Sequence, residues 1–194
     1  MSKLNIFLRL SLILSFFFFF SIKGNGQLVS YGGGFNISNG TTINIDKYDE
    51  DYYTSSYGVH LKTSYKLDYK LRLVPKLAFF FPRTKDLEGG EATTMLTDLN
   101  INLYKINNPR DLIRTYIFGG VNFSGWYLKD DSKNPENQIN LKKYGLYPGV
   151  SAGAGFKFNI KHDMELFIEG KYLQYLTVMS GQVMGLVGVN MMLD

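Results

Sequence analysis

MLTDLNINLY, residues 95–104, is the stretch of sequence that decides the fold. Apolar and polar side chains alternate along it, with Leu99, Ile101 and Leu103 on one face and Asp98 and Asn100 on the other. A period of two residues is that of an extended strand, whose successive side chains point to opposite sides. An amphipathic helix would instead repeat its apolar residues every three to four positions. The stretch therefore predicts a β-strand with one apolar and one polar face.

The same alternation continues on both sides of this stretch. In the next segment Ile117 and Phe123 share one face, and Arg114 and Asn122 share the other. The pattern as a whole predicts eight strands, at 27–38, 55–67, 70–81, 92–106, 112–128, 143–159, 163–175 and 182–193. Most are longer than the ~5–6 residues usual in globular proteins, and long enough for the ~9–11 residues that cross a bilayer at a tilt.

The connections between these strands alternate in length. Long connections are expected at 39–54, 82–91 and 129–141, and short turns at 66–70, 107–111 and 159–163. Long loops on one side and tight turns on the other, around an even number of strands, are typical of outer-membrane β-barrels. The pattern predicts an all-β, eight-stranded antiparallel transmembrane barrel of up-and-down topology, with both termini in the periplasm.

The first 26 residues have the features of a cleaved signal peptide. Lys3 and Arg9 give a positive start, an apolar run follows, and Gly24 and Gly26 supply the small residues of a cleavage site. The apolar run of about 13 residues would rise only ~20 Å as a helix, short of the ~30 Å hydrocarbon core. We therefore expect a signal peptide at 1–26 and a single barrel domain at 27–194.

Removing the leader changes what the composition implies. The leader carries three of the 21 basic side chains and none of the 17 acidic ones, so the mature chain has a net charge of +1. Such a charge gives no argument for nucleic acid as a partner. The sequence has no cysteine, which excludes a lipoprotein anchor, disulfides and a cysteine zinc site. We expect no cofactor and no metal.

The two faces of the strands can be arranged in two ways. A soluble sandwich or lipocalin-like barrel would turn the apolar face inward, whereas a membrane barrel turns it outward to lipid. Long strands, mixed charges on the polar face and aromatic residues near strand ends favour the membrane barrel. The aromatic residues expected at the two membrane interfaces are Tyr31, Tyr57, Tyr65, Phe79, Phe81, Tyr104, Tyr127, Tyr144, Phe158 and Tyr172.

In a membrane barrel the charged face lines the lumen. Counting from the turns places five charged residues near one middle layer, where they would form a structural polar network: Lys62, Lys76, Asp98, Glu169 and Lys171. Eight strands leave little more than side-chain space inside. The inner face of 143–159 is rich in glycine, and its neighbour carries Tyr116, Phe118 and Trp126, which predicts large rings packed over glycines. Pro75 and Pro148 fall inside strands, where we expect β-bulges or shifted boundaries.

The chain resembles a known family in its last third. The glycine-punctuated strand 149–156, the following segment 166–172 and the closing segment 185–190 are similar to small outer-membrane β-barrels, the family of OmpA-type transmembrane domains and OmpX-like proteins. Related barrels include the PorT-like group, which is linked to protein secretion. The resemblance implies an outer-membrane location and contact with outer-membrane lipid. We expect a monomer.

Catalytic chemistry is poorly supported. His162 lies in a predicted turn, and His60 faces the lumen with Ser55 and Ser56 upstream, at no spacing that singles out a catalytic triad. We expect no enzyme and no catalytic residues. Four residues of the first long loop are suited to surface contacts with an extracellular or periplasmic protein: Tyr48, Asp49, Tyr52 and Tyr53.

Three functions remain open at this point. The first is a structural or surface-interaction barrel with a lumen largely filled by side chains. The second is a secretion- or transport-associated barrel of the PorT-like kind. The third is a soluble periplasmic, lipocalin-like binder of apolar ligands. They differ in whether the lumen is open and in which face of the strands meets the surroundings.

Overall fold

The computed structural model describes residues 27–43, 52–87, 90–107, 109, 111–130, 141–176 and 181–193. The strands are β1 (Gln27–Ser38), β2 (Thr42–Ile43), β3 (Tyr52–Tyr53), β4 (Tyr57–Lys66), β5 (Leu71–Leu87), β6 (Gly90–Ile106), β7 (Ile113–Asp130), β8 (Leu141–Lys161), β9 (Met164–Tyr175) and β10 (Gln182–Met192). The signal peptide predicted at 1–26 lies outside the described residues.

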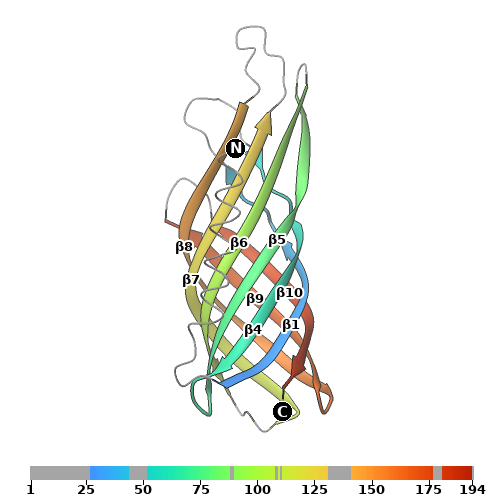
Figure 1. Ribbon diagram of the computed structural model, residues 1–194, viewed down its shortest axis with the longest axis vertical. Helices are drawn as coiled ribbons and strands as arrows, with labels where there is room; N and C mark the ends of the chain where they lie inside the picture. The colour runs from blue at the N-terminus through green and yellow to red at the C-terminus, as the bar shows by residue number, and fades with distance from the viewer. Residues whose placement is uncertain are drawn as a thin grey trace.

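Eight of these strands close into a barrel, and each pairs antiparallel with its neighbour in the chain (Figure 1). The order around the barrel is β1-β10-β9-β8-β7-β6-β5-β4, so β1 closes the sheet between β10 and β4. The predicted eight-stranded meander is confirmed, with strand positions close to those expected. β2 and β3 form a separate two-stranded sheet within the first connection.

The two ends of the barrel differ. The turn end, where β1 begins and β10 ends, carries the short connections β4–β5, β6–β7 and β8–β9. At the opposite loop end, β5 to β8 continue beyond the other strands (Figure 1). These four strands have 17, 17, 18 and 21 residues, whereas β1, β4, β9 and β10 have 10 to 12. Half of the wall therefore projects past the rim as a four-stranded sheet.

This projection corrects the predicted loops. The connection expected at 82–91 is largely strand, because the β5–β6 ladder continues from Arg83↔Thr94 to Leu87↔Gly90. Strands β7 and β8 likewise enter the expected 129–141 loop and pair as far as Asp130↔Leu141. Pro82 suggested a loop, but it lies where the β5–β6 register shifts, between Phe80 and Arg83, and the strand resumes after it.

The expected bulges at the two strand prolines are not found. The β5–β6 register runs unshifted through Pro75↔Ile101, and the β4–β5 ladder leaves a gap between its Lys62↔Lys76 and Tyr65↔Leu73 pairs. Pro148 pairs with Phe123 in register but lies just beyond the first β8–β9 pair, Gly149↔Tyr175. Each proline therefore occupies a position where the neighbouring ladder is open on one side, so its missing N–H breaks no pairing.

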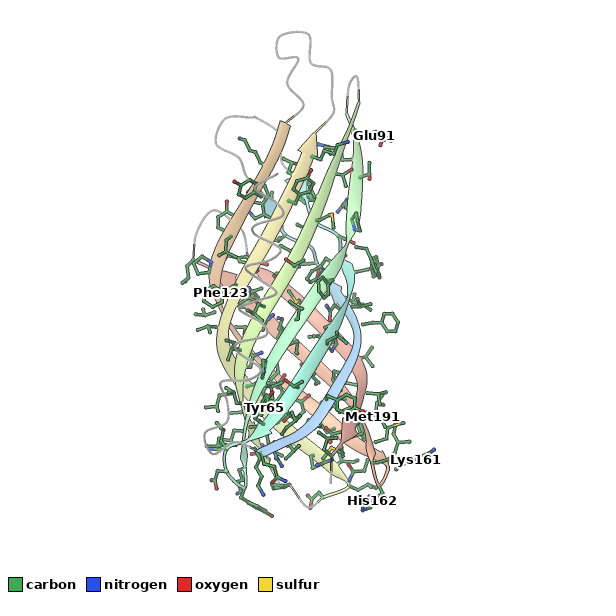
Figure 2. The ribbon with its side chains drawn as sticks, in the orientation of Figure 1. Tyr65, Glu91, Phe123, Lys161, His162 and Met191 are labelled. Carbon is green, nitrogen blue, oxygen red and sulfur yellow. The ribbon has the colours of Figure 1, made fainter. Side chains whose placement is uncertain are left out.

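The burial pattern decides which face is apolar. Large apolar side chains are exposed on the outside of the barrel, among them Phe35, Leu61, Ile117, Phe123 and Ile168, while the charged alternate face is buried (Figure 2). This arrangement overturns the soluble lipocalin-like alternative, which requires the reverse. Among the described residues, no helix is long and apolar enough to cross a membrane.

The predicted aromatic positions need one correction. Tyr31, Tyr57 and Tyr144 are exposed on the outside, as interface residues should be. Tyr65 and Tyr104, however, are only 6% and 1% exposed. Tyr104 follows the inward alternation of β6, and its hydroxyl bonds inside the barrel. For Tyr104 the parity of the position was therefore a better guide than nearness to a strand end, whereas Tyr65 is buried although it shares the parity of the outward Tyr57 and Leu61.

Candidate functional site

The middle of the lumen is organised around one carboxylate. Glu169 on β9 is 2% exposed and accepts hydrogen bonds from Lys62 Nζ at 2.6 Å and Lys76 Nζ at 2.5 Å. The hydroxyls of Tyr104 and Tyr116 donate to its Oε1 atom at 3.1 and 3.0 Å. These partners come from β4, β5, β6 and β7, so the glutamate cluster (Lys62, Lys76, Tyr104, Tyr116 and Glu169) ties both halves of the wall together.

The other two residues of the predicted network lie in a separate set of contacts. Asp98 accepts a hydrogen bond from Ser124 Oγ at 2.5 Å, and Asn122 Nδ2 donates to the same Ser124 at 2.6 Å. Lys171 Nζ donates to Asn100 Oδ1 at 2.8 Å. The structure thus brings Lys62, Lys76 and Glu169 into direct contact. Asp98 and Lys171 bond to hydroxyl and amide groups and lie close enough to attract each other electrostatically.

A second ionic cluster lies at the turn end and was not predicted. Glu165 on β9 pairs with Arg114 and with Lys157, each at 2.7 Å, and accepts a hydrogen bond from Asn190 Nδ2 at 2.6 Å. Arg114 also bonds Asn159. All these residues except Asn159 are buried, and their parity along the strands marked them as inward. The cluster could not be predicted because the sequence does not indicate the strand register that brings these residues together.

The predicted packing of rings over glycines is confirmed. Trp126 pairs with Gly145, Phe118 with Gly153 and Tyr116 with Gly155. A Cβ atom added at Gly145 would lie 2.5 Å from Trp126 Nε1, and one added at Gly155 would lie 2.6 Å from the Tyr116 ring. Only glycine therefore leaves room for these inward rings.

Aromatic and apolar side chains fill the lumen on either side of the charges. Tyr104 stacks on Phe118 and Tyr116, with ring centroids 4.7 and 5.0 Å apart. Towards the loop end the lumen is occupied by a mouth cluster of buried apolar residues: Ala78, Phe80, Ala92, Leu96, Trp126, Leu128, Leu173, Tyr175, Met184 and Leu186. The barrel is thus a filled cylinder through the parts described.

The two histidines lie far apart in the barrel, one buried in the lumen and one in a turn. His60 is buried, with its Nδ1 atom 2.5 Å from Asn36 Oδ1 and its ring 5.6 Å from that of Phe167. His162 lies exposed in the β8–β9 turn (Figure 2). In the described part of the chain, no group of three or more His, Asp or Glu residues is placed to hold a metal ion.

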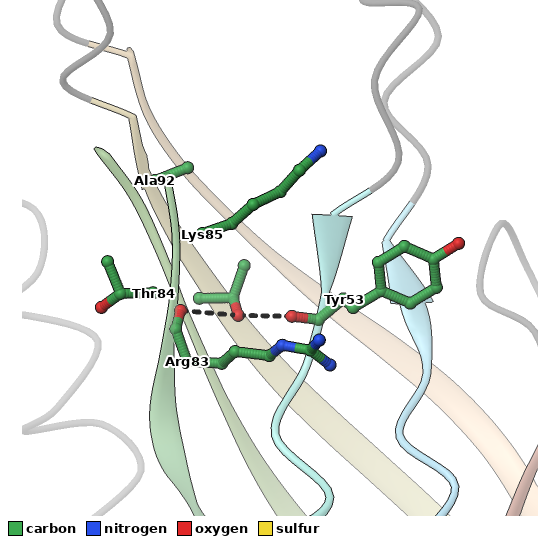
Figure 3. Close-up of a pocket in the computed structure, with 6 residues that line it drawn as sticks. Tyr53, Arg83, Thr84, Lys85 and Ala92 are labelled. Atoms are coloured by element: carbon green, nitrogen blue, oxygen red, sulfur yellow. Dashed lines mark hydrogen bonds between the residues drawn. The ribbon is translucent and has the colours of Figure 1, made fainter. Parts of the chain in front are cut away.

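The predicted surface residues are only partly visible. Tyr48 and Asp49 lie outside the described residues, as does the side chain of Tyr52. Tyr53 ends the small β2–β3 sheet at the mouth of the barrel and is 47% exposed. The guanidinium carbon of Arg83 lies 5.8 Å from the centre of the Tyr53 ring (Figure 3). This pair lines a hollow at the base of the projecting sheet.

No protein-family model and no curated protein sequence matches the chain. Solved structures do match. The attachment invasion locus protein Ail of Yersinia pestis superposes with a TM-score of 0.56 over 88% of this chain and 100% of its own, at 12% identity. The chain has the fold of the small outer-membrane β-barrels. Neisserial surface protein A gives a TM-score of 0.57 at 9% identity, covering 86% of this chain and 96% of its own.

A third outer-membrane barrel extends the comparison across distant bacteria. A major outer membrane protein from Thermus thermophilus superposes with a TM-score of 0.56 at 10% identity, over 84% of this chain and 99% of its own. The neighbours are covered almost completely, so the likeness concerns the whole barrel. The resemblance to OmpA-type and OmpX-like barrels predicted from sequence is confirmed at the level of the fold, and fold alone does not assign an activity.

Proposed function

We propose that this chain is an outer-membrane barrel with a structural and surface-interaction role, exported by the signal peptide at 1–26. The observation that carries the proposal is the four-stranded projecting sheet formed by the loop-end halves of β5 to β8. The filled lumen supports no passage for solutes, whereas a sheet that stands beyond the rim presents surface to the surroundings. The secretion or transport alternative, which in its simplest form needs an open lumen, is therefore less well supported.

The projecting sheet has two edges without a neighbouring barrel strand. The β4–β5 ladder ends at Gly58↔Phe80, and the β8–β9 ladder begins at Gly149↔Tyr175. Beyond these pairs, β5 and β8 carry main-chain groups that an extended segment of a partner can pair with. Both edges also carry proline and lysine, the residues that restrain uncontrolled strand pairing. The proposed partner is an extracellular protein, and the barrel itself a monomer surrounded by lipid.

The proposed orientation places the loop end outside the cell and both termini in the periplasm. Outer-membrane barrels usually have short turns on the periplasmic side and longer loops on the extracellular side. Ail, one of the fold neighbours, is described as an attachment invasion locus protein, which is a surface role. We carry over the class of role, a surface contact, and no particular ligand.

Cysteine labelling tests the orientation directly, because the natural sequence has no cysteine. Thr84→Cys on the projecting sheet should react with a membrane-impermeant maleimide on intact cells. Asp68→Cys in the β4–β5 turn should react only after the outer membrane is permeabilised. Both variants should migrate differently on a gel with and without boiling, as folded barrels do. Labelling in the opposite order would contradict the orientation, and recovery in soluble periplasm would contradict the location.

The interaction role has its own test. A photo-crosslinking residue replacing Tyr144 on the β8 edge should give discrete adducts on intact cells. The same residue replacing Ile168, in the apolar belt, serves as the control and should give none. Equal yields from the two positions would contradict a surface contact at the sheet while leaving the outer-membrane location standing.

A further inference from the structure

We propose that the hollow at the base of the projecting sheet binds a phosphate group. It has a volume of about 90 Å³ and is lined by Tyr53, Arg83, Thr84, Lys85, Ala92 and Thr94 (Figure 3). None of these six residues is acidic, and two carry a positive charge. A hollow of this size has room for a small oxyanion such as phosphate.

The cations face this hollow because of an irregularity in β5. Phe80 pairs with Leu96, but Arg83 pairs with Thr94, so two residues of β5 stand opposite one of β6. Without this bulge the inward alternation of β5 would continue through Thr84 and Asp86. With it, Arg83 and Lys85 pair with the buried Thr94 and Ala92 on the inner face. The bulge exchanges an inward carboxylate for two inward cations, which is how bulges redirect side chains at functional positions.

The displaced residues confirm the new alternation. Thr84 pairs with Thr93, and their hydroxyl oxygens are 3.5 Å apart on the outer face. Asp86 pairs with Glu91 further along the same face. Asp86 and Glu91 therefore lie on the opposite side of the sheet from Arg83 and Lys85, and the six residues that line the hollow carry two positive charges and no negative one.

The walls of the hollow are held together by Thr94. Its hydroxyl donates to the main-chain carbonyl of Tyr53 at 2.7 Å and lies 3.4 Å from that of Arg83. Tyr53 in turn places its ring beneath the Arg83 guanidinium. A cation stacked on an aromatic ring loses less freedom when it binds, because part of its ordering is already in place.

The chemistry of the lining selects the ligand class. Arginine offers a planar fork of donors that matches phosphate oxygens, and lysine adds a point charge. The hollow opens at the mouth of the barrel, so the phosphate group can come from a soluble ion or from a lipid headgroup at the rim. The shared feature is the phosphate itself, and the experiment separates the two sources.

Binding is measured on the full mature protein in non-ionic detergent, by equilibrium dialysis with labelled inorganic phosphate against chloride at equal ionic strength. We expect saturable binding of one phosphate per chain. Arg83→Gln should weaken it by at least about tenfold. The double variant T84K/K85T keeps the composition but moves the lysine to the outer face, and it should weaken binding similarly. Lys129→Gln, on the outer face of the same sheet, is the matched control and should bind normally.

The source of the phosphate is read from competition. Phosphatidic acid added to the micelles should displace inorganic phosphate at low molar ratio if a lipid headgroup is the occupant, and should displace it only at high ratio if the ligand is soluble. Both outcomes support a phosphate site. Absence of saturable binding of either form would overturn it. So would equal binding by the natural protein, R83Q and T84K/K85T, all shown to be folded by their heat-dependent migration.

Discussion

Glu169 accepts four buried side-chain hydrogen bonds, more than any other residue in the described part of the lumen. Its carboxylate forms ion pairs with Lys62 and Lys76, both of which are buried. Glu169→Gln keeps the shape but leaves two buried ammonium groups without their anion. Breaking a buried ion pair in this way costs about 3–5 kcal/mol of unfolding free energy. Urea unfolding in lipid vesicles, followed by the fluorescence of the sole tryptophan, measures the loss.

The exposed Glu91 provides the comparison for this variant. Glu91→Gln removes the same charge from the outer face of the β5–β6 hairpin, and we expect it to change the unfolding free energy by less than about 0.5 kcal/mol. If E169Q and E91Q were equally stable, the glutamate cluster would not hold the barrel together.

Gly145 carries the second prediction at this scale. An added methyl group would meet the ring of Trp126 first, at 2.5–2.9 Å. Gly145→Ala should therefore displace the ring and lower the unfolding free energy by about 1–3 kcal/mol. The displacement should also shift the emission of Trp126. Gly170→Ala is the matched control, because a Cβ added there has nothing within 4 Å. Unchanged emission in G145A would contradict the packing.

At the scale of strands, the alternation of polar and apolar residues was enough to place most of the wall. Residues 95–104 and 113–124 lie in β6 and β7 with the faces that their parity indicated. The bulge before Arg83 was not foreseeable, because Pro82 is equally compatible with a loop. A single residue of slip reverses every side chain beyond it, so the inward cations of β5 could not be identified from the pattern.

Contacts between strands on opposite sides of the barrel could not be predicted from the sequence for a related reason. Lys62 and Glu169 are 107 positions apart, and they meet because strand stagger places them at one height. The sequence indicated that both face inward, which narrows their partners to other inward residues. The sequence did not indicate that Asp98 bonds to a hydroxyl and Lys171 to an amide. It also did not indicate that Glu165 pairs with Arg114 and Lys157. Register, and not residue type, separates these outcomes.

The projecting β5–β6 hairpin is expected to be energetically separate from the barrel. Beyond Phe80, β5 has no β4 partner, and β6 begins to pair with β7 only at Ala92, so the tip of the hairpin contributes few contacts to the closed wall. Replacing residues 85–92 with Asn-Gly keeps the Thr84↔Thr93 pair and supplies a favoured two-residue turn. The shortened protein should still show heat-dependent migration, with a loss of about 1–3 kcal/mol from the removed Ala92 contacts. Failure to fold would show that the projection is needed for closure.

At the scale of the whole molecule, the lumen is closed at two levels in series. The mouth cluster fills the loop end, and the glutamate cluster fills the middle, with stacked rings beside it. An eight-stranded barrel has little interior beyond its own side chains. The natural protein should therefore show no steady conductance in planar bilayers, where a porin of larger strand number serves as the positive control.

The serial arrangement makes a sharper prediction about variants. Trp126→Ala opens space only in the mouth cluster, and Glu169→Ala opens space only in the middle, so each single variant leaves the other barrier in place. We expect both single variants to remain silent in planar bilayers and the double variant W126A/E169A to give measurable current if it folds. Steady channels in the natural protein, or in either single variant, would show that the two clusters do not seal the lumen. Such channels would also support the alternative function of a transport-associated barrel.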